Sequence, residues 1–167
     1  MIYSAPIRTL AGCDGRYPTL EEESACMAYA ASLPARLRVA DLISQKEAEI
    51  VRYAIDHLKR HYPRFAPQHD RAWEKASRDM TLHLRYAVQA MVVDDLEMPK
   101  DKLYVWITTI VRGTGHTPQI MRDGIGAMVE ACQRLLPADA MAIAEPYLHR
   151  MVHDLSDFPE PMKPAVD

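Results

Sequence analysis

Charged residues cluster in and just before the stretch EKASRDMTLHLRYAV at positions 74–88. At 100° per residue, Arg71, Lys75, Arg78 and Asp79 fall within one arc of a helix, and the opposite side carries the apolar residues Met80, Leu84, Ala87 and Met91. One interpretation is a solvated face with weak ion pairs such as Lys75 with Asp79. The other is a site for a ligand with carboxylates, which basic residues pair, and N–H groups, which the Asp79 carboxylate accepts. A linear tetrapyrrole has both kinds of group.

Histidines offer a second kind of chemistry. His57 and His61 lie one helical turn apart, which suits a metal, but no third ligand has a matching position. No metal site is therefore predicted. Haem would need an axial ligand, and the predicted helix at 100–112 contains no histidine, which disfavours haem. Haem bound through His57, His61 or His83 stays open as a third alternative, and it predicts a Soret band.

Signatures of catalysis are missing from the sequence. The glycines of RGTG and RDGIG do not follow a predicted strand, so we interpret them as a turn and as close helix packing. There is no G-x-S-x-G motif, and no cysteine has an evident histidine partner. We interpret Cys26 and Cys132 as small core residues. The sequence predicts a protein that is not an enzyme.

Composition narrows the class of protein. The chain has 167 residues, of which 49% are hydrophobic, so one domain spanning residues 1–167 is expected. A net charge of -3 gives no basic footprint for nucleic acid. The three cysteines have no C-x-x-C spacing, which favours a reducing, cytoplasmic location. No apolar run approaches the roughly 18 residues of a membrane span, and the first ten residues do not resemble a signal peptide.

The elements that must position these residues are all expected to be helical. A capping box at Thr19 and Glu22 starts a helix that reaches about residue 32, and Pro34 opens a segment that continues it as one bent element. A second capping box at Ser44 and Glu47 predicts a new helix that ends before Pro63. Further helices are predicted at about 71–93, 100–112, 117–136 and 138–155. About seven helices around one core favour a globin-like arrangement.

Four segments then point to a family. GRYPTLEEE, HYPRF, SRDMTLHLRYAVQAMV and the helix with DKL and a later tryptophan resemble, in this order, the corresponding segments of phycobiliproteins, the globin-like light-harvesting subunits of cyanobacteria. The resemblance covers about residues 13–155, and RDMxxxLRYA is most similar to the chromophore helix of the beta-type subunits. It implies an N-terminal helical extension at about 1–33 for dimer contact, a globin core at 34–155 and a flexible tail at 156–167.

The resemblance also implies a bilin site. In the family, the aspartate of the RD pair accepts hydrogen bonds from inner pyrrole nitrogens, a role that falls on Asp79, and basic neighbours pair with propionates. Arg78 takes that second role here, with Lys75 and Arg71 as further candidates. His69 and Trp73 differ from the residues expected in pigment subunits and are predicted to contact a ring. For the dimer interface, the resemblance implies a pair of Asp14 with Arg85 across the contact, together with Tyr17.

One departure changes the predicted function. The thioether cysteine of the family lies three residues before the aspartate, and that position is Ala76 here. Cys132 does not fall in the second attachment loop of some beta subunits. The chain therefore better resembles the phycobiliprotein-related globins associated with bilin biosynthesis. We predict a cytoplasmic homodimer that binds biliverdin or phycocyanobilin non-covalently, as a carrier or sink and not an antenna, with bilin-biosynthesis enzymes as candidate partners. The alternative is a non-chromophoric sensor or interaction globin.

Overall fold

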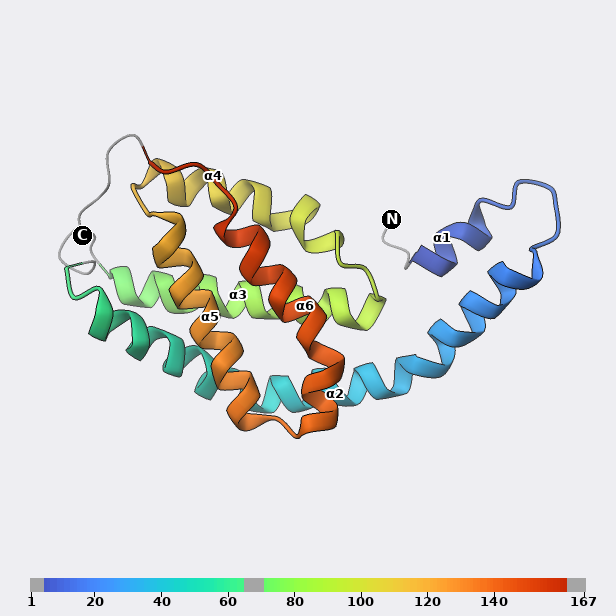
Figure 1. Cartoon of the computed structure of the whole chain (residues 1–167), viewed down its shortest axis with the longest axis horizontal. Helices are drawn as coiled ribbons and strands as arrows, with labels where there is room; N and C mark the ends of the chain where they lie inside the picture. Colours follow the sequence, from blue (N-terminus) through green and yellow to red (C-terminus); the bar gives the residue numbers. More distant parts are fainter. Residues whose placement is uncertain (1–4, 65–70, 162–167) are drawn as a thin grey trace.

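The regular structure of the described residues is entirely helical. A computed structural model describes residues 5–64 and 71–161. Its elements are α1 (Ala5–Ala11), α2 (Leu20–His61), α3 (Ala72–Val93), the π-helical turn η2 (Lys100–Tyr104), α4 (Val105–Gly113), α5 (Pro118–Leu135) and α6 (Ala138–Ser156) (Figure 1). The prediction of an all-α fold is confirmed. The predicted tail at 156–167 lies partly outside the described residues, and His69 lies wholly outside them.

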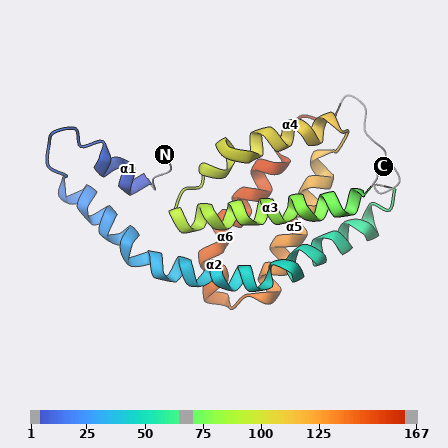
Figure 2. The same ribbon diagram turned by 180° about the vertical axis from the view of Figure 1, so that it is seen from behind.

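The longest helix, α2, begins at the predicted capping box. Thr19 Oγ accepts a hydrogen bond from the amide of Glu22 (3.3 Å), and the Glu22 carboxylate accepts one from the amide of Thr19 (2.7 Å). The helix then continues through Pro34 as a single curved element, as predicted (Figure 2). The separate helix predicted to start at Ser44 is wrong. Ser44 lies inside α2, where its backbone amide is already bonded in the helix.

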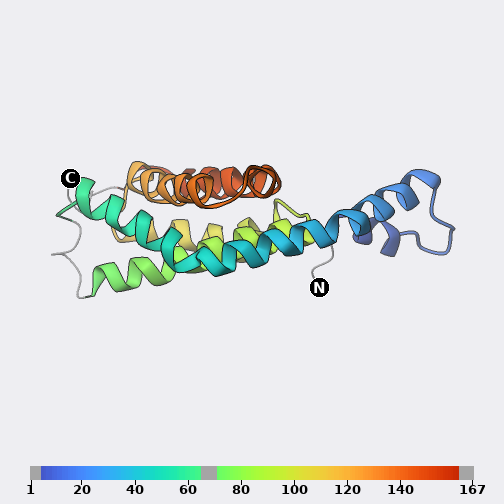
Figure 3. The same ribbon diagram turned by 90° about the horizontal axis from the view of Figure 1, so that it is seen from below.

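The core lies between two layers of helices. α5 and α6 form one layer, and α2, α3 and α4 form the other (Figure 3). Both layers contribute the largest fully buried side chains: Tyr104, Ile43, Ile50, Leu84, Met91, Ile125, Met128, Leu148, Met151, Leu155 and Cys132. The first half of α2 projects beyond this core as an arm, with α1 folded beside it (Figure 1).

Two contacts join the arm to the core near the end of α3. Arg8 of α1, a helix that was not predicted, pairs with the buried carboxylate of Asp95 at 2.7 Å. Arg36 of α2 is 4% exposed and donates hydrogen bonds to the carbonyls of Met91 (3.2 Å) and Val92 (2.8 Å). Both carbonyls belong to the last turn of α3, where intrahelical donors run out, and the Met91 carbonyl also accepts a longer bond from the amide of Asp94 (3.3 Å). Arg36 therefore caps one helix from within another.

The remaining helices follow the predicted boundaries closely. The segment predicted at 100–112 is helical, but its first turn is the π-helical η2. Thr117 caps α5 by accepting from the amide of Ile120, and Pro118 is the first helical residue, as predicted. Pro146 lies inside α6 without ending it. No helix within residues 5–64 and 71–161 is both long and apolar enough to cross a membrane.

One glycine of each doublet has the predicted structural role. Gly115 has a φ of 83°, which favours glycine, in the turn between α4 and α5. Gly124 of α5 allows close helix packing, because a Cβ there would lie 2.9 Å from Met80 Cε of α3 and 3.1 Å from Leu58 Cδ1 of α2. Met80 and Leu58 also line the cavity described next. The lack of a side chain at Gly124 therefore sets how closely the helices approach one another around that cavity.

Candidate functional site

A cavity of about 370 Å³ lies between α3, α4 and α5. Its polar side chains come mainly from α3, and its apolar side chains come from all the surrounding helices. The α3 residues are Ala72, Lys75, Ala76, Arg78, Asp79, Met80 and His83; the others are Leu58, Trp106, Ile107, Ile110, Val111, Thr114, His116, Ile120, Met121 and Ile125. Largely apolar walls with a few grouped polar side chains are typical of sites for small organic ligands.

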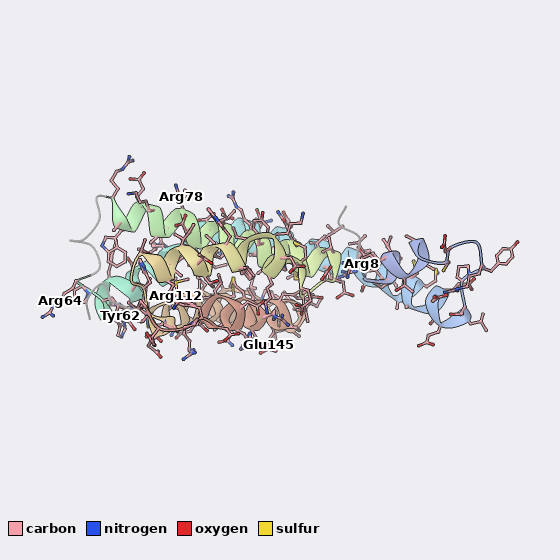
Figure 4. All side chains as sticks on the ribbon, turned by 90° about the horizontal axis from the view of Figure 1, so that it is seen from above. Arg8, Tyr62, Arg64, Arg78, Arg112 and Glu145 are labelled. Atoms are coloured by element: carbon pink, nitrogen blue, oxygen red, sulfur yellow. The ribbon has the colours of Figure 1, made fainter. Side chains whose placement is uncertain are left out.

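Arg78 and Asp79 form an ion pair at the edge of this cavity. Arg78 Nε and Nη2 donate to Asp79 Oδ1 at 3.0 and 2.8 Å, which leaves Oδ2 without a hydrogen bond within the described part of the chain. The side chain of Arg78 is 75% exposed and that of Asp79 is 41% exposed, so both can turn toward a ligand. Figure 4 places Arg78 toward the end of the core that lies away from Arg8 and the arm.

The weak ion pair suggested between Lys75 and Asp79 is not present among the described residues; the Asp79 carboxylate pairs with Arg78 instead, through Oδ1. Lys75 lines the cavity without an ion pair among the described residues. Three predicted members of the site therefore lie together: Lys75, Arg78 and Asp79.

Two other predicted contacts lie elsewhere. Arg71 is not in the cavity wall; it adopts a left-handed conformation (φ 57°) just before α3 and pairs with Glu74 at 2.6 Å. Trp73 lines a separate groove between α2 and α3, with the ammonium of Lys59 over its ring at 5.9 Å. The structure thus brings neither side chain to the cavity.

His83 is a cavity residue that the sequence did not single out for a bilin. It is 3% exposed, and neither ring nitrogen has a hydrogen-bond partner within the described residues. Its ring meets the ring of Tyr104 edge-on, with centroids 6.1 Å apart. Burial lowers the pKa of His83 to about 4, although the nearby Asp79 carboxylate opposes this shift, so the imidazole is neutral at pH 7. The sequence signal that could have identified His83 is its position four residues after Asp79, which places both on one face of the helix.

The mouth of the cavity carries exposed apolar side chains from α4. Trp106 is 62% exposed and Ile110 is 41% exposed, whereas Ile107, on the same helix, is buried. Large apolar side chains grouped around an opening often mark a ligand or partner site. This edge of α4 faces the charged residues of α3 across the cavity.

The other histidines and the cysteines give no metal centre in residues 5–64 and 71–161, where no group of three or more candidate ligands comes together. His57 and His61 stack on α2 with ring centroids 4.2 Å apart and do not line the cavity. Of the three histidines considered for haem, His83 alone lies in the cavity wall. Cys132 is a core residue as predicted, and burial raises the pKa of its thiol to about 12. Cys26 is half-buried on the arm, so its assignment to the core is wrong.

The predicted interface residues lie on two parts of the chain. Asp14 and Tyr17 are exposed in the loop between α1 and α2, and Tyr17 is 94% exposed. Arg85 of α3 makes two hydrogen bonds of 2.7 Å with the Glu47 carboxylate of α2 in the same chain. Within a single chain, Arg85 therefore already has an acidic partner.

Comparison with known proteins identifies the family. The sequence model of the phycobilisome protein family matches residues 10–155, and the chain belongs to this family. The allophycocyanin alpha-B chains of Pyropia yezoensis and Porphyra purpurea are each 25% identical over 146 residues, which cover 84% of this chain and 91% of each relative. The resemblance to phycobiliproteins and the globin-like fold are thus confirmed, although these two relatives are alpha-type chains and the sequence motif had suggested the beta type.

Proposed function

We propose that this protein binds a linear tetrapyrrole such as biliverdin or phycocyanobilin, non-covalently, in the cavity between α3, α4 and α5. It would act in the cytoplasm as a carrier or sink for bilin-producing enzymes, and neither as an antenna nor as an enzyme. The observation that carries the proposal is the grouping of Lys75, Arg78 and Asp79 on one edge of an apolar cavity.

The chemistry of that edge matches the groups of a bilin. A bilin has an apolar conjugated chain, inner N–H groups and two propionates. Asp79 Oδ2 is available to accept hydrogen bonds from the N–H groups. Arg78 and Lys75 carry positive charge for the propionates, and arginine binds carboxylates through two parallel N–H donors. The apolar residues of α4 and α5 then cover the rings.

Ala76 supports a non-covalent mode. It lines the cavity between Lys75 and Asp79, at the position of the thioether cysteine in pigment subunits. An alanine methyl group cannot form that bond. Cys132 offers no replacement, because it is fully buried in the core and does not line the cavity. The pigment would therefore be released by dilution or by a partner enzyme, as a carrier requires.

The test is to mix the apoprotein with biliverdin at micromolar concentration and record the absorption spectrum. We expect a shifted and sharpened red band, because a bilin held in a rigid site samples fewer conformations than the free pigment. A spectrum identical to that of free biliverdin would refute the proposed function.

Asp79→Ala is expected to weaken biliverdin binding by about tenfold to a hundredfold, since hydrogen bonds to a charged group contribute about 1.5–3 kcal/mol. The band position should also shift. Titration followed by absorbance measures both effects. Glu74→Ala is the matched control, because it removes an exposed carboxylate of α3 that lies outside the cavity lining. Equal affinities of Asp79→Ala and the wild type would remove Asp79 from the site.

The alternative, a sensor or interaction globin without a pigment, rests on the same Ala76. It predicts a pocket filled by the protein's own side chains or by an apolar ligand. The 370 Å³ cavity favours the pigment-binding proposal over the side-chain-filled form, and the charges of Lys75, Arg78 and Asp79 on its edge favour it over an apolar ligand.

We also propose a homodimer formed through the arm. The loop and the arm expose Tyr17, Leu20 (86%), Met27 (72%) and Leu37 (50%) to solvent in the single chain. Exposed apolar side chains in such a group usually mark a protein interface. Asp14 of one chain would pair with Arg85 of the other across this interface. Arg85 would then either give up its bond to Glu47 of its own chain or bond both carboxylates.

The double variant Leu20→Glu, Met27→Glu should be monomeric at concentrations where the wild type is a dimer, because two charges would be buried in the contact. Sedimentation or light scattering measures the mass. Val105→Glu, which changes an exposed apolar residue of α4, should leave the mass unchanged.

For the charge pair, Asp14→Arg and Arg85→Asp should each weaken association more than the double swap. Equal weakening by all three would show that the two side chains do not pair.

A further inference from the structure

The imidazole of His83 is unusual among the polar groups of this fold. Both of its ring nitrogens are buried without a hydrogen-bond partner in residues 5–64 and 71–161. Nearly all buried polar groups in proteins have a partner, because an unsatisfied donor or acceptor loses its bonds to water without replacement. Arg36 is satisfied in larger part: its terminal nitrogens donate four hydrogen bonds and only its Nε lacks a partner in the described residues, whereas His83 makes no side-chain hydrogen bond at all. The missing partner of His83 therefore points to something outside the apoprotein.

The position of His83 shows where that partner would lie. His83 lines the cavity on the same helix as Asp79, four residues further along. Residues four apart on a helix are neighbours on one face, with Cβ atoms about 5–6 Å apart. A ligand that brings an N–H group to Asp79 therefore brings an adjacent part of itself to His83. The other polar pair of the cavity, Thr114 and His116, already shares a hydrogen bond of 2.7 Å.

We propose that His83 is a ligand-binding residue that hydrogen-bonds the lactam of a terminal ring of the tetrapyrrole, an inference that rests on the proposed function. A neutral imidazole has one donor and one acceptor nitrogen. A lactam has an N–H donor beside a carbonyl acceptor, so either tautomer of His83 finds a partner in it. Asp79 accepts only, and Arg78 and Lys75 donate only. His83 can therefore distinguish a linear tetrapyrrole, which ends in lactams, from a cyclic one, which has none.

This assignment makes opposite predictions for stability and for binding. A side chain retained for the fold should destabilise the apoprotein when it is replaced. A side chain retained for a ligand, and unsatisfied without it, should not. Leucine is an apolar replacement of similar size. Glutamine keeps one donor and one acceptor.

The experiment compares wild type, His83→Leu and His83→Gln by thermal unfolding of the apoprotein and by titration with biliverdin. We expect His83→Leu to unfold at the wild-type temperature or above it, and to bind biliverdin about tenfold more weakly with a displaced red band. His83→Gln should retain affinity within about threefold. His57→Leu, outside the cavity, is the control for both measurements.

Three outcomes would overturn the inference and are distinguishable. Wild-type affinity and spectrum in His83→Leu would remove His83 from the contact while the proposed function stands. Failure of the wild type to change the biliverdin spectrum would remove the proposed function together with this inference. A Soret band on haem addition that His83→Leu abolishes, without any effect of this variant on biliverdin, would make His83 an axial ligand instead of a lactam partner.

Discussion

Replacing Arg36 with alanine is expected to lower the free energy of unfolding by about 2–4 kcal/mol, or the melting temperature by roughly 5–15 °C. The guanidinium donates to the carbonyls of Met91 and Val92, and also to the carbonyl of Tyr29 (2.9 Å) and the hydroxyl of Ser32 (3.1 Å). It also lies over the Tyr29 ring, 4.4 Å from its centroid. Alanine would remove the donors that Arg36 supplies to both carbonyls, leaving that of Met91 only the longer bond from the amide of Asp94, and would open a void between the two helices.

Two variants separate this cause from a general effect of removing charge. Arg38→Ala, two residues along α2 and exposed, should change stability by less than about 0.5 kcal/mol. Arg36→Lys keeps the charge but cannot span both sets of acceptors, so it should recover only part of the loss. Chemical denaturation of all three measures the differences. A midpoint for Arg36→Ala equal to that of Arg38→Ala would show that the cap does not stabilise the fold.

Arg36 also affects the proposed dimer. It bonds two residues of the arm, Tyr29 and Ser32, while it caps α3 in the core. Tyr29 and Ser32 belong to the same helix as Arg36, so it is the loss of the bonds to the α3 carbonyls that frees the arm to change its angle to the core. Hydrogen exchange in residues 20–35 of Arg36→Ala should therefore increase along with the loss in stability.

The sequence predicted those parts of the fold that depend on local chemistry. The capping box at Thr19, the cap at Thr117 and the apolar side of α3 involve residues within a few positions of one another. The second capping box, at Ser44, has the same pattern but is not used. Val39, Ile43 and Ile50 are buried on both sides of it, so packing on the core keeps α2 continuous there.

The candidate site was predictable to a similar extent. The helical projection placed Lys75, Arg78 and Asp79 in one arc, and in the structure all three line the same cavity. It failed for Arg71 because that residue has left-handed backbone angles and does not follow the helical 100° spacing. Arg36 could not be identified from the sequence, and the only signal for His83 was its position four residues after Asp79. What each does depends on which helices cross it, and only the assembled fold supplies that information.

The second large effect is expected from Ala76→Cys, which should convert reversible binding of phycocyanobilin into covalent attachment. The thiol would add across the exocyclic carbon–carbon double bond of the terminal ring: sulfur bonds one carbon, a proton goes to the conjugated system, and no oxidant or leaving group is needed. Ala76 lines the cavity beside Lys75 and Arg78. Positive charge nearby lowers a cysteine pKa and increases the reactive thiolate fraction.

Ser77→Cys is the matched control for this variant. Ser77 is the next residue of α3, also half-buried, but it lines the separate groove toward α2 with Glu47 and Thr81. After incubation with phycocyanobilin, intact-mass measurement under denaturing conditions should show one pigment per chain for Ala76→Cys. Wild type and Ser77→Cys should show almost none, and Cys132 should stay unmodified because it is buried with a raised pKa. Equal labelling of the two cysteine variants would indicate reaction with any accessible thiol. Absence of labelling in both, while the pigment still binds, would place its reactive ring away from Ala76 and require a different orientation of the bilin along α3.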